Sequence, residues 1–312
     1  MRKISLIVFS VFILIFVTGC GKTEKKTDKI SVVCTNFAIY DWVNNIIDEN
    51  HFQVALLSGN GDVHSFQPTA KDMARISDCD LFIYVGGESD AWAEKFVAQN
   101  SINSLKLSDL LKNELLCGEE KHHEHDHKNN EFDEHIWLSM KLAQKAVDGI
   151  YEELIKVVPE NLSAHISEYR KNKDDYKALL EDLDNEYNNA VDSSKDRTIV
   201  VADRFPFLYL TNDYDISYEA AFSGCSTEQD ASFEVIAKLT QTVEKLQKSA
   251  VVVLEKSNSS VVKTVKENSK SRDIDVVVMN SCQTIDKADI EAGAGYIEIM
   301  EENLEALKKA LE

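Results

Sequence analysis

Histidines gather in one short stretch of this 312-residue chain, residues 121–137, which reads KHHEHDHKNNEFDEHIW. Half of the eight histidines of the chain lie within six residues of this stretch, interleaved with acidic side chains: His122, His123, His125 and His127. Neutral imidazole is the commonest metal ligand in proteins, and short His-rich tracts are typical of metal binding. A hydrophilic surface loop with incidental histidines, or an engineered tag, would have a similar composition. We interpret residues 121–128 as an accessory metal collector of low selectivity.

Three further residues are candidate metal ligands because each lies in a loop that follows or precedes a predicted element. His64 lies in a Gly-rich loop, His135 closes the His-rich loop before a helix, and Asp203 directly follows the apolar run RTIVVA. Two imidazoles and a carboxylate suit Zn²⁺, Mn²⁺ or Fe²⁺. Taken singly, His64 can equally be a turn residue, His135 a helix cap or packed histidine, and Asp203 a cap or a partner of Arg204. The long intervals between them carry little information on their own.

The elements that must position these side chains alternate along the first half of the chain. Short apolar runs predict strands over residues 30–35, 52–57, 80–85 and 104–107. Asn36 stands where a helix cap would, Thr69 and Asp72 match a capping box, and residues 91–98 predict a further helix. Strands that alternate with helices indicate βαβ units and a mostly parallel sheet.

The same alternation restarts in the second half. Strands are predicted over residues 197–202, 215–222, 250–254 and 274–279, and helices over 206–211, 232–248, 257–268 and 293–311. On one face the helix over 232–248 carries Phe233, Ile236, Leu239, Val243 and Leu246. The fold class is therefore α/β, with two β/α lobes built on mostly parallel sheets.

A long helical segment separates the two lobes. Residues 138–157 predict one helix, Pro159 interrupts it, and Asn161 can cap a second helix that runs without Gly or Pro to about Val191. Thirty residues of helix are about 45 Å long, more than one small domain needs. We predict a rigid strut (161–192) between an N-terminal lobe (30–160, with the His-rich loop at 117–134) and a C-terminal lobe (193–312). The loops at the carboxyl ends of the strands would line a cleft between the lobes.

The first residues are expected to be a targeting segment rather than part of the fold. Arg2 and Lys3 precede an apolar run that is shorter than the ~20 residues a spanning helix needs, so residues 1–19 predict a secretory signal. The ending Val17-Thr18-Gly19-Cys20 resembles the lipobox of bacterial lipoproteins, which implies lipidation of Cys20. Residues 20–29 would then form a flexible tether.

The charge of the chain excludes some partners. Its formal net charge is −20, and loss of Arg2 and Lys3 with the signal would take it to −22. So acidic a chain is unsuited to bind nucleic acid or an anionic lipid surface, and it favours the gathering of cations.

Three segments resemble the matching blocks of one family. These are residues 35–42 (TNFAIYDW), 62–69 (DVHSFQPT) and 133–139 (DEHIWLS), and they are similar to the zinc/manganese substrate-binding lipoproteins of ABC importers. The resemblance runs from about residue 30 to the C-terminus and includes the acidic His-rich insert typical of zinc members. It implies two lobes bridged by a rigid helix, a single metal in the cleft, and His64 and His135 as the first two ligands.

The resemblance also implies a place and a partner. The chain would be a monomer anchored through Cys20 to the outer face of the cytoplasmic membrane, and would deliver its metal to an ABC permease. Zn²⁺ is the expected cargo, with Mn²⁺ or Fe²⁺ as the alternative.

The remaining ligand positions depart from the family pattern. Zinc members usually have histidine at the third position, whereas this chain has Asp203 in the block VADRFPF. The fourth position is usually acidic, whereas this chain has Asn280-Ser281-Cys282-Gln283. Cys282 would either supply a thiolate, which favours zinc, or form a disulfide with Cys225. With the disulfide, the fourth ligand would be water, Glu228 or Glu255.

Two other classes of function compete with metal import. A secreted metallohydrolase would use His64, His135 and Asp203 with an open position for water. The chain has no HExxH helix and no Gly-x-Ser-x-Gly elbow, so we expect no enzyme. An adhesin has no recognisable binding repeat here and would leave the histidine arrangement unexplained.

Overall fold

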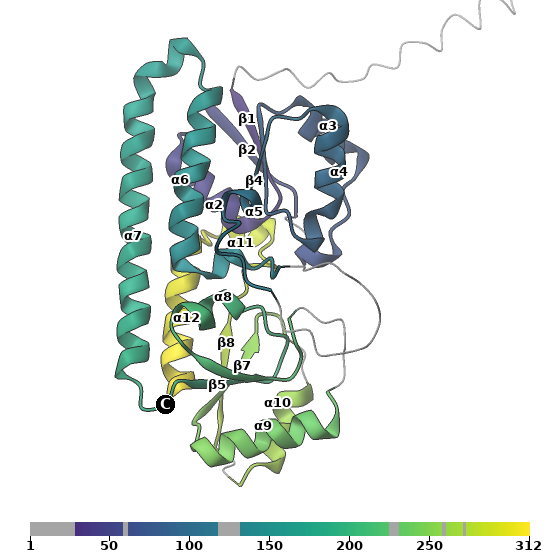
Figure 1. Cartoon of the computed structure of the whole chain (residues 1–312), viewed down its shortest axis with the longest axis vertical. Coiled ribbons are helices and arrows are strands. Elements are labelled where there is room, and N and C mark those ends of the chain that lie inside the picture. The colour runs from purple at the N-terminus through teal and green to yellow at the C-terminus, as the bar shows by residue number, and fades with distance from the viewer. Residues whose placement is uncertain (1–28, 59–61, 118–131, 225–230, 258–259, 271–272) are drawn as a thin grey trace, which may run out of the picture.

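The computed structural model of this chain contains two four-stranded parallel sheets, each flanked by helices (Figure 1). The structure describes residues 29–58, 62–117, 132–224, 231–257, 260–270 and 273–312. The strand order is β2-β1-β3-β4 in the first sheet and β6-β5-β7-β8 in the second. Each sheet begins with a strand that ends up at its centre and receives a parallel neighbour on both sides. The predicted α/β class with two β/α lobes is confirmed.

The first lobe follows the predicted alternation closely. Asn36 caps the first helix by accepting a hydrogen bond from the N–H of Ile39, and Thr69 and Asp72 form the predicted capping box. The short helix α5 was not predicted. The elements of this lobe are β1 (Ile30–Cys34), α2 (Phe37–Ile46), β2 (Phe52–Leu56), α3 (Ala70–Asp78), β3 (Leu81–Tyr84), α4 (Ala91–Asn100), β4 (Ser104–Lys106) and α5 (Leu107–Leu110).

The second lobe repeats the pattern. Its elements are β5 (Thr198–Val201), α8 (Leu208–Asp213), β6 (Ser217–Ala220), α9 (Phe233–Leu246), β7 (Ala250–Leu254), α10 (Ser260–Asn268), β8 (Asp275–Met279), α11 (Lys287–Glu291) and α12 (Tyr296–Leu311). Helix α11 was not predicted. The apolar face predicted for α9 is wrong at its first residue, because Phe233 is 94% exposed whereas Leu239 and Val243 are buried.

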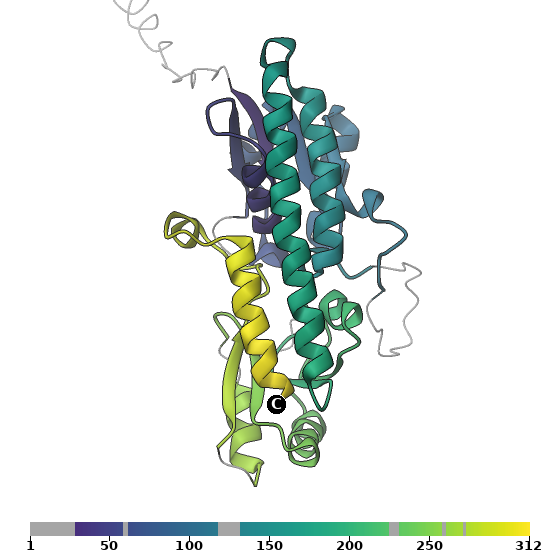
Figure 2. The ribbon, with the colours of Figure 1, turned by 90° about the vertical axis from the view of Figure 1, so that its left-hand side faces the viewer.

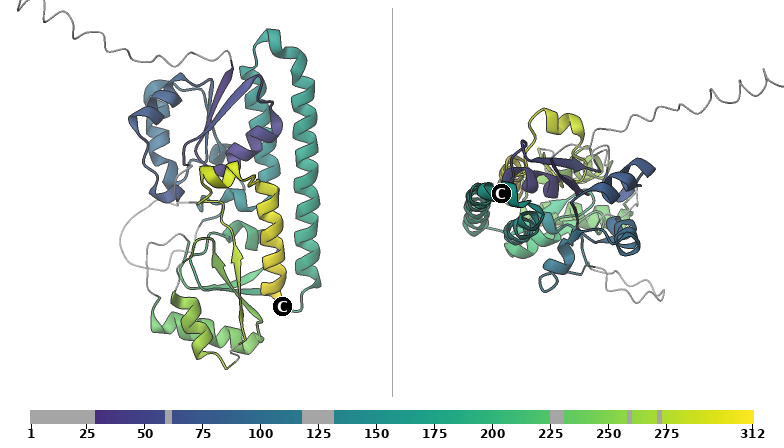
Figure 3. Two further views of the ribbon diagram at one scale, coloured as in Figure 1. Left: turned by 180° about the vertical axis from the view of Figure 1, so that it is seen from behind. Right: turned by 90° about the horizontal axis from the view of Figure 1, so that it is seen from above.

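Helix α7 (Ile166–Ser193) runs beside both lobes (Figure 2). It contacts α6 (Met140–Val157) and α2 in the first lobe and α12 in the second. Its 28 residues span about 42 Å. The predicted start at Asn161 is wrong, because residues Glu160–His165 form a 3₁₀ segment, η5, after Pro159 and the α-helix begins only at Ile166. Seen from behind, both sheets lie on the same side of α7 (Figure 3).

One continuous hydrophobic core joins the lobes along this helix. The same cluster of buried side chains includes Ile39 of α2, Leu180 of α7, Leu254 of β7 and Leu304 of α12. Trp137 adds a direct link: its Nε1 donates to the carbonyl of Ser281 at 2.8 Å, and the hydroxyl of Tyr296 donates to the carbonyl of Trp137. Separation of the lobes would therefore expose buried apolar surface, which is unfavourable.

Asp41 ties three helices together at this junction. Its carboxylate, on α2, accepts hydrogen bonds from the hydroxyl of Tyr176 on α7 at 2.9 Å and from the backbone N–H of Tyr296 on α12. Burial raises the pKa of Asp41 to about 6, although both hydrogen bonds oppose the rise. The folded protein thus holds the Asp41 proton more tightly than the unfolded chain does between about pH 4 and pH 6.

The raised pKa of Asp41 predicts how the substitution Asp41→Asn changes the dependence of stability on pH. A raised acid pKa in the folded state makes the stability of the natural chain fall as pH rises through this window. The variant cannot ionise, so its stability relative to the natural chain should increase between pH 4 and pH 7. The expected gain is roughly 2–3 kcal/mol in the free energy of unfolding. Denaturant titrations at several pH values measure it, with the exposed Asp109→Asn as control. Parallel stability curves for both chains would contradict the role of Asp41.

Candidate metal centre

His64 is presented by a short 3₁₀ turn in the loop that leaves the carboxyl end of β2. The turn, η2, covers Val63–Ser65, and Asp62 caps it by accepting a hydrogen bond from the N–H of His64 at 3.0 Å. The His64 side chain is 25% exposed. Its Nδ1 lies 2.8 Å from Oγ of Ser89 and 2.9 Å from Oε1 of Glu134.

His135 lies at the cap position of the 3₁₀ turn η4 (Ile136–Leu138), just before α6. Asp133 fixes it twice, because Oδ1 of Asp133 accepts from the backbone N–H of His135 at 2.9 Å and lies 2.7 Å from its Nδ1. The His135 side chain is only 4% exposed. A carboxylate bound to Nδ1 fixes the tautomer that carries its lone pair on Nε2.

The two rings face each other through their Nε2 atoms, the nitrogens that are not paired with a carboxylate. Nε2 of His64 and Nε2 of His135 are 3.4 Å apart. Two nitrogen ligands of a tetrahedral zinc ion, each roughly 2.0–2.1 Å from the metal, lie about 3.3–3.4 Å apart. The pair therefore already has the spacing that a shared divalent ion requires.

Glu134 supports His64 rather than its sequence neighbour. Asp133 pairs with His135, whereas Glu134 pairs with His64. Ser89 completes the network, since its Oγ donates to Oε1 of Glu134 at 2.6 Å and its N–H donates to Oε2 at 3.0 Å. Burial raises the pKa of Glu134, but the hydrogen bonds from His64 and Ser89 outweigh it and leave this pKa below its usual value. Glu134 is thus an anion that orients His64.

Asp203 follows β5 and comes from the opposite lobe. Oδ1 of Asp203 accepts from the N–H of Arg204 at 2.8 Å, and Oδ2 accepts from the hydroxyl of Ser257 and from the N–H of Leu254. His64, His135 and Asp203 do not form a group of ligand atoms within 4.8 Å of one another in the described part of the chain. The loop of Asp203 nevertheless contacts the loop of His64, because Nη1 of Arg204 donates to Oδ2 of Asp62 at 3.2 Å.

The two described candidates for the fourth position have other contacts. Cys282 is 2% exposed and forms no disulfide with another described cysteine, and burial together with the charges of Glu255 and Asp41 raises the pKa of its thiol well above the usual value. A neutral buried thiol is a poor ligand. The carboxylate of Glu255 accepts from the N–H and Oγ of Ser281 and from Oγ1 of Thr284, which anchors the loop after β8.

Several sequence candidates lie outside the described residues. They are the predicted signal and Cys20 within residues 1–28, the loop histidines His122, His123, His125 and His127, and the residues Cys225 and Glu228. The roles predicted for them, and the Cys225–Cys282 disulfide, stay predictions. No helix in the described ranges is long and apolar enough to cross a membrane.

Sequence reasoning missed two residues of this network. Ser89 bridges His64 and Glu134, and Arg204 was considered only as a possible partner of Asp203. Ser89 follows the turn Gly86-Gly87 after β3, so its position after a parallel strand was an available signal. The contact between Arg204 and Asp62 joins lobes and has no signal in the order of residues.

A two-lobed α/β chain bridged by one long helix, with carboxylate-oriented imidazoles where its lobes meet, has the features of a metal-binding substrate-binding protein. The family model described as zinc-uptake complex component A, periplasmic, matches residues 32–310. The chain therefore belongs to this family, whose members are metal-binding components of transport systems.

Curated relatives carry zinc in their names. The high-affinity zinc uptake system protein ZnuA of Bacillus subtilis is 30% identical over 302 residues, which cover 93% of this chain and 90% of the relative. The zinc-binding lipoprotein AdcA of Streptococcus pneumoniae is 29% identical over 99% of this chain. This alignment covers 61% of AdcA, so the chain spans about three fifths of that relative.

Solved structures share the architecture. The crystal structure of Zn(II)-bound AdcA from S. pneumoniae matches with a TM-score of 0.71 and 27% identity, and covers 91% of this chain and 58% of AdcA. The metal-dependent lipoprotein YcdH of B. subtilis matches with a TM-score of 0.73 and 27% identity over 91% of this chain and all of that chain. The laminin-binding protein of Streptococcus agalactiae, at 22% identity and a TM-score of 0.72, shares the fold.

Gly87 provides a test of the Glu134 position. A Cβ at residue 87 would lie 2.3 Å from Oε2 and 2.4 Å from Cβ of Glu134, so Gly87→Ala must displace Glu134 from His64. We expect Zn²⁺ affinity to fall by about ten- to a hundredfold, as for other lost partners of ligating histidines. Gly149→Ala, whose Cβ meets only the Leu110 side chain, is the matched control. Equal affinities for both variants would show that Glu134 does not support the site.

Proposed function

We propose that this chain captures Zn²⁺ outside the cytoplasm and delivers it to an ABC permease for import. The observation that carries the proposal is the 3.4 Å separation of the two Nε2 atoms, with a carboxylate on each Nδ1. Both rings are held before the metal arrives, so little ordering is left to oppose binding. Membership of the zinc-uptake family supports the same cargo.

The proposed ligands are His64, His135 and Asp203. Asp203 is supported by its place after β5 and by the contact of the adjacent Arg204 with Asp62. To bind the ion, the carboxylate would exchange one hydrogen bond, from Ser257 or Leu254, for the metal. Glu228 or a water molecule would fill the fourth position, because burial disfavours the thiolate of Cys282 and Glu255 holds its own loop.

Zinc is favoured over manganese by the nitrogen ligands. Imidazole suits Zn²⁺, whereas Mn²⁺ prefers carboxylate, carbonyl and water ligands and a larger coordination number. The carboxylate at position 203 reduces this preference and keeps an Mn²⁺ or Fe²⁺ importer of the same family as the alternative. Competition between Zn²⁺ and Mn²⁺ for the purified chain distinguishes the two.

Release of the ion to a permease would follow from local changes rather than wide opening. The shared core and the contacts of Trp137 keep the lobes together, whereas the pair of Arg204 and Asp62 is partly exposed, at 31% and 24%. A permease loop that replaces this ion pair would free the turn that holds His64. Cys20 as a lipid anchor would keep the chain near the permease, and His122, His123, His125 and His127 would raise the local metal concentration.

The proposed site predicts a clear order among three variants. His64→Ala removes one of the two proposed nitrogen ligands, so the tightest Zn²⁺ site should weaken by at least a hundredfold in a chelator competition assay. Deletion of residues 121–128 should leave that site in place and reduce the number of Zn²⁺ ions that bind with lower affinity. Glu114→Gln, a surface change that breaks an ion pair with Lys145, is the control. If the deletion abolishes the tightest site while His64→Ala does not, the loop is the primary binder.

Asp203→Asn tests the third ligand. The amide keeps an acceptor for Ser257 but loses the acceptor for the N–H of Arg204 and the charge that a divalent ion needs, so Zn²⁺ affinity should fall at least tenfold, more than any loss of stability explains. Asp213→Asn is matched, because Asp213 is also largely buried and accepts from Ser139. An unchanged affinity of Asp203→Asn would remove Asp203 from the ligand set.

A further inference from the structure

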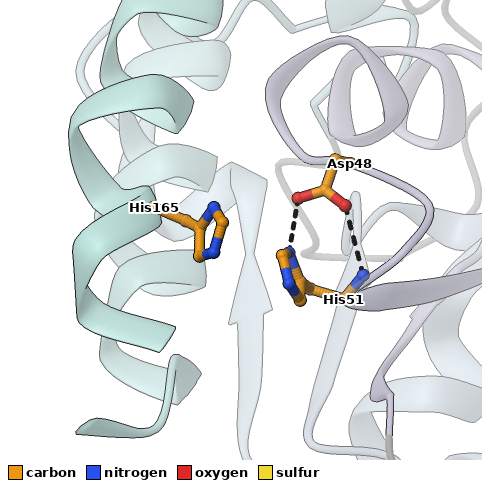
Figure 4. Close-up of side chains that lie close together, drawn as sticks. All are labelled: Asp48, His51 and His165. Atoms are coloured by element: carbon orange, nitrogen blue, oxygen red, sulfur yellow. Dashed lines mark hydrogen bonds and ion pairs between the residues drawn. The ribbon is translucent and has the colours of Figure 1, made fainter. Parts of the chain in front are cut away.

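A second group of metal-ligating side chains lies at the other end of the first lobe. Asp48, His51 and His165 each have a ligand atom within 4.8 Å of those of the other two (Figure 4). Asp48 and His51 belong to the turn between α2 and β2, and His165 is the last residue of η5, before α7. This turn lies at the amino end of β2, whereas the loop of His64 leaves its carboxyl end. The two groups are thus at opposite edges of the sheet.

Asp48 is held as an anion that faces His51. Its Oδ1 accepts from the N–H groups of Asn50 and His51, and its Oδ2 lies 2.7 Å from Nδ1 of His51. The hydroxyl of Tyr169, on the first turns of α7, donates to the same Oδ2 at 2.9 Å. Partial burial raises the pKa of Asp48, but these hydrogen bonds outweigh it and lower the pKa to about 2.

His165 closes the group from the helical hairpin. Its ring centroid lies 4.2 Å from that of His51, and its Nδ1 lies 3.5 Å from a carboxylate oxygen of Glu168. The side chains of Asp48, His51 and His165 are 23%, 24% and 39% exposed, so an ion can reach them from solvent. A hydrogen-bonded turn accounts for Asp48 and His51, but it does not require a second imidazole from η5 to face them.

We propose that Asp48, His51 and His165 form a second site for a divalent transition-metal ion of the zinc class, separate from the centre between the lobes. Two imidazole nitrogens and one carboxylate oxygen, with open positions for water, are a typical set for such an ion. The nearby Glu168 adds negative charge. Ligand atoms of a bound zinc lie about 3.3 Å apart, so binding would draw these partly exposed side chains closer together than the 4.8 Å within which they now lie.

A bound ion would link two segments that are far apart in the sequence. It would fasten the start of α7 to the turn that leads into β2, and so fix the outer end of the helix that spans the lobes. Since the ligands are partly exposed and less constrained than His64 and His135, the ion should bind more weakly here than between the lobes. The site would therefore fill only when zinc is abundant.

Zinc titration of a reduced background tests the site. The mature chain with His64→Ala and His135→Ala and without residues 121–128 should still bind one Zn²⁺ equivalent in equilibrium dialysis, and a further His165→Ala should abolish that equivalent. Asn161→Ala, in the same 3₁₀ segment η5 and exposed, should keep it. No zinc bound by the background protein, or the same equivalent after His165→Ala, would overturn the proposal. Failure of the function proposed above would appear separately, as an unchanged tightest site in the single His64→Ala variant.

Chemical modification gives a readout that does not depend on the variants. In the otherwise natural mature chain, Zn²⁺ should protect both His51 and His165 from diethyl pyrocarbonate, as measured by peptide mass spectrometry. Protection should appear at higher zinc concentration than the protection of His64. Equal modification of His51 and His165 with and without excess zinc would overturn the proposal even if His165→Ala failed to fold.

Discussion

The rest of the metal centre depends on two adjacent carboxylates that act on different histidines. Asp133 binds Nδ1 of His135 in its own loop, and Glu134 reaches Nδ1 of His64 in another loop. Each pairing directs an Nε2 toward the same point, at a separation of 3.4 Å. When both Nδ1 atoms carry the proton, the two Nε2 lone pairs at this distance repel each other, and a cation between them would remove the repulsion. The carboxylates therefore hold an arrangement that is most favourable when a metal is present.

This arrangement needs rigid support, which comes from elements on both sides of the site. Gly87 has no Cβ and so admits Glu134, and Asp90 holds the same turn by accepting from the N–H groups of Val85 and Gly86. Trp137, two residues after His135, is fixed by Ser281 and Tyr296 of the second lobe. The ligand loops thus inherit their positions from the core that the lobes share along α7.

Local signals in the sequence predicted the elements, while contacts across space decided the details of the site. Asn36 and the pair Thr69 and Asp72 act within one turn of helix, so their capping roles could be predicted and are confirmed. The central strands β1, β3, β5 and β7 were equally clear, because buried parallel strands are continuous apolar runs. The predicted start of α7 was wrong because the residues after Pro159 suit a 3₁₀ turn as well as an α-helical turn.

The side-chain partners could be predicted only in part, since neighbours in sequence need not be neighbours in the site. Asp133 lies two residues from His135, and its role was within reach of the sequence. Glu134 points the other way to His64, and Arg204 crosses to Asp62, because the fold brings their loops together. Phe233 fits the apolar period of α9 but is exposed at the first residue of the helix, whereas Leu239 and Val243 are buried.

The two histidine pairs of this chain differ in a way that follows from their surroundings. His64 and His135 each have a carboxylate of their own, and His135 is almost fully buried, so the ion that they hold would be bound tightly and lost slowly. His51 shares Asp48 with Tyr169, and His165 lies at the surface beside Glu168, so that ligand exchange with water is easy. A carrier benefits from this division: cargo needs a preorganised site that only a partner can disturb. A site at the far edge of the same sheet can instead respond to the free ion concentration, and its occupancy would stiffen the end of α7 remote from the cargo.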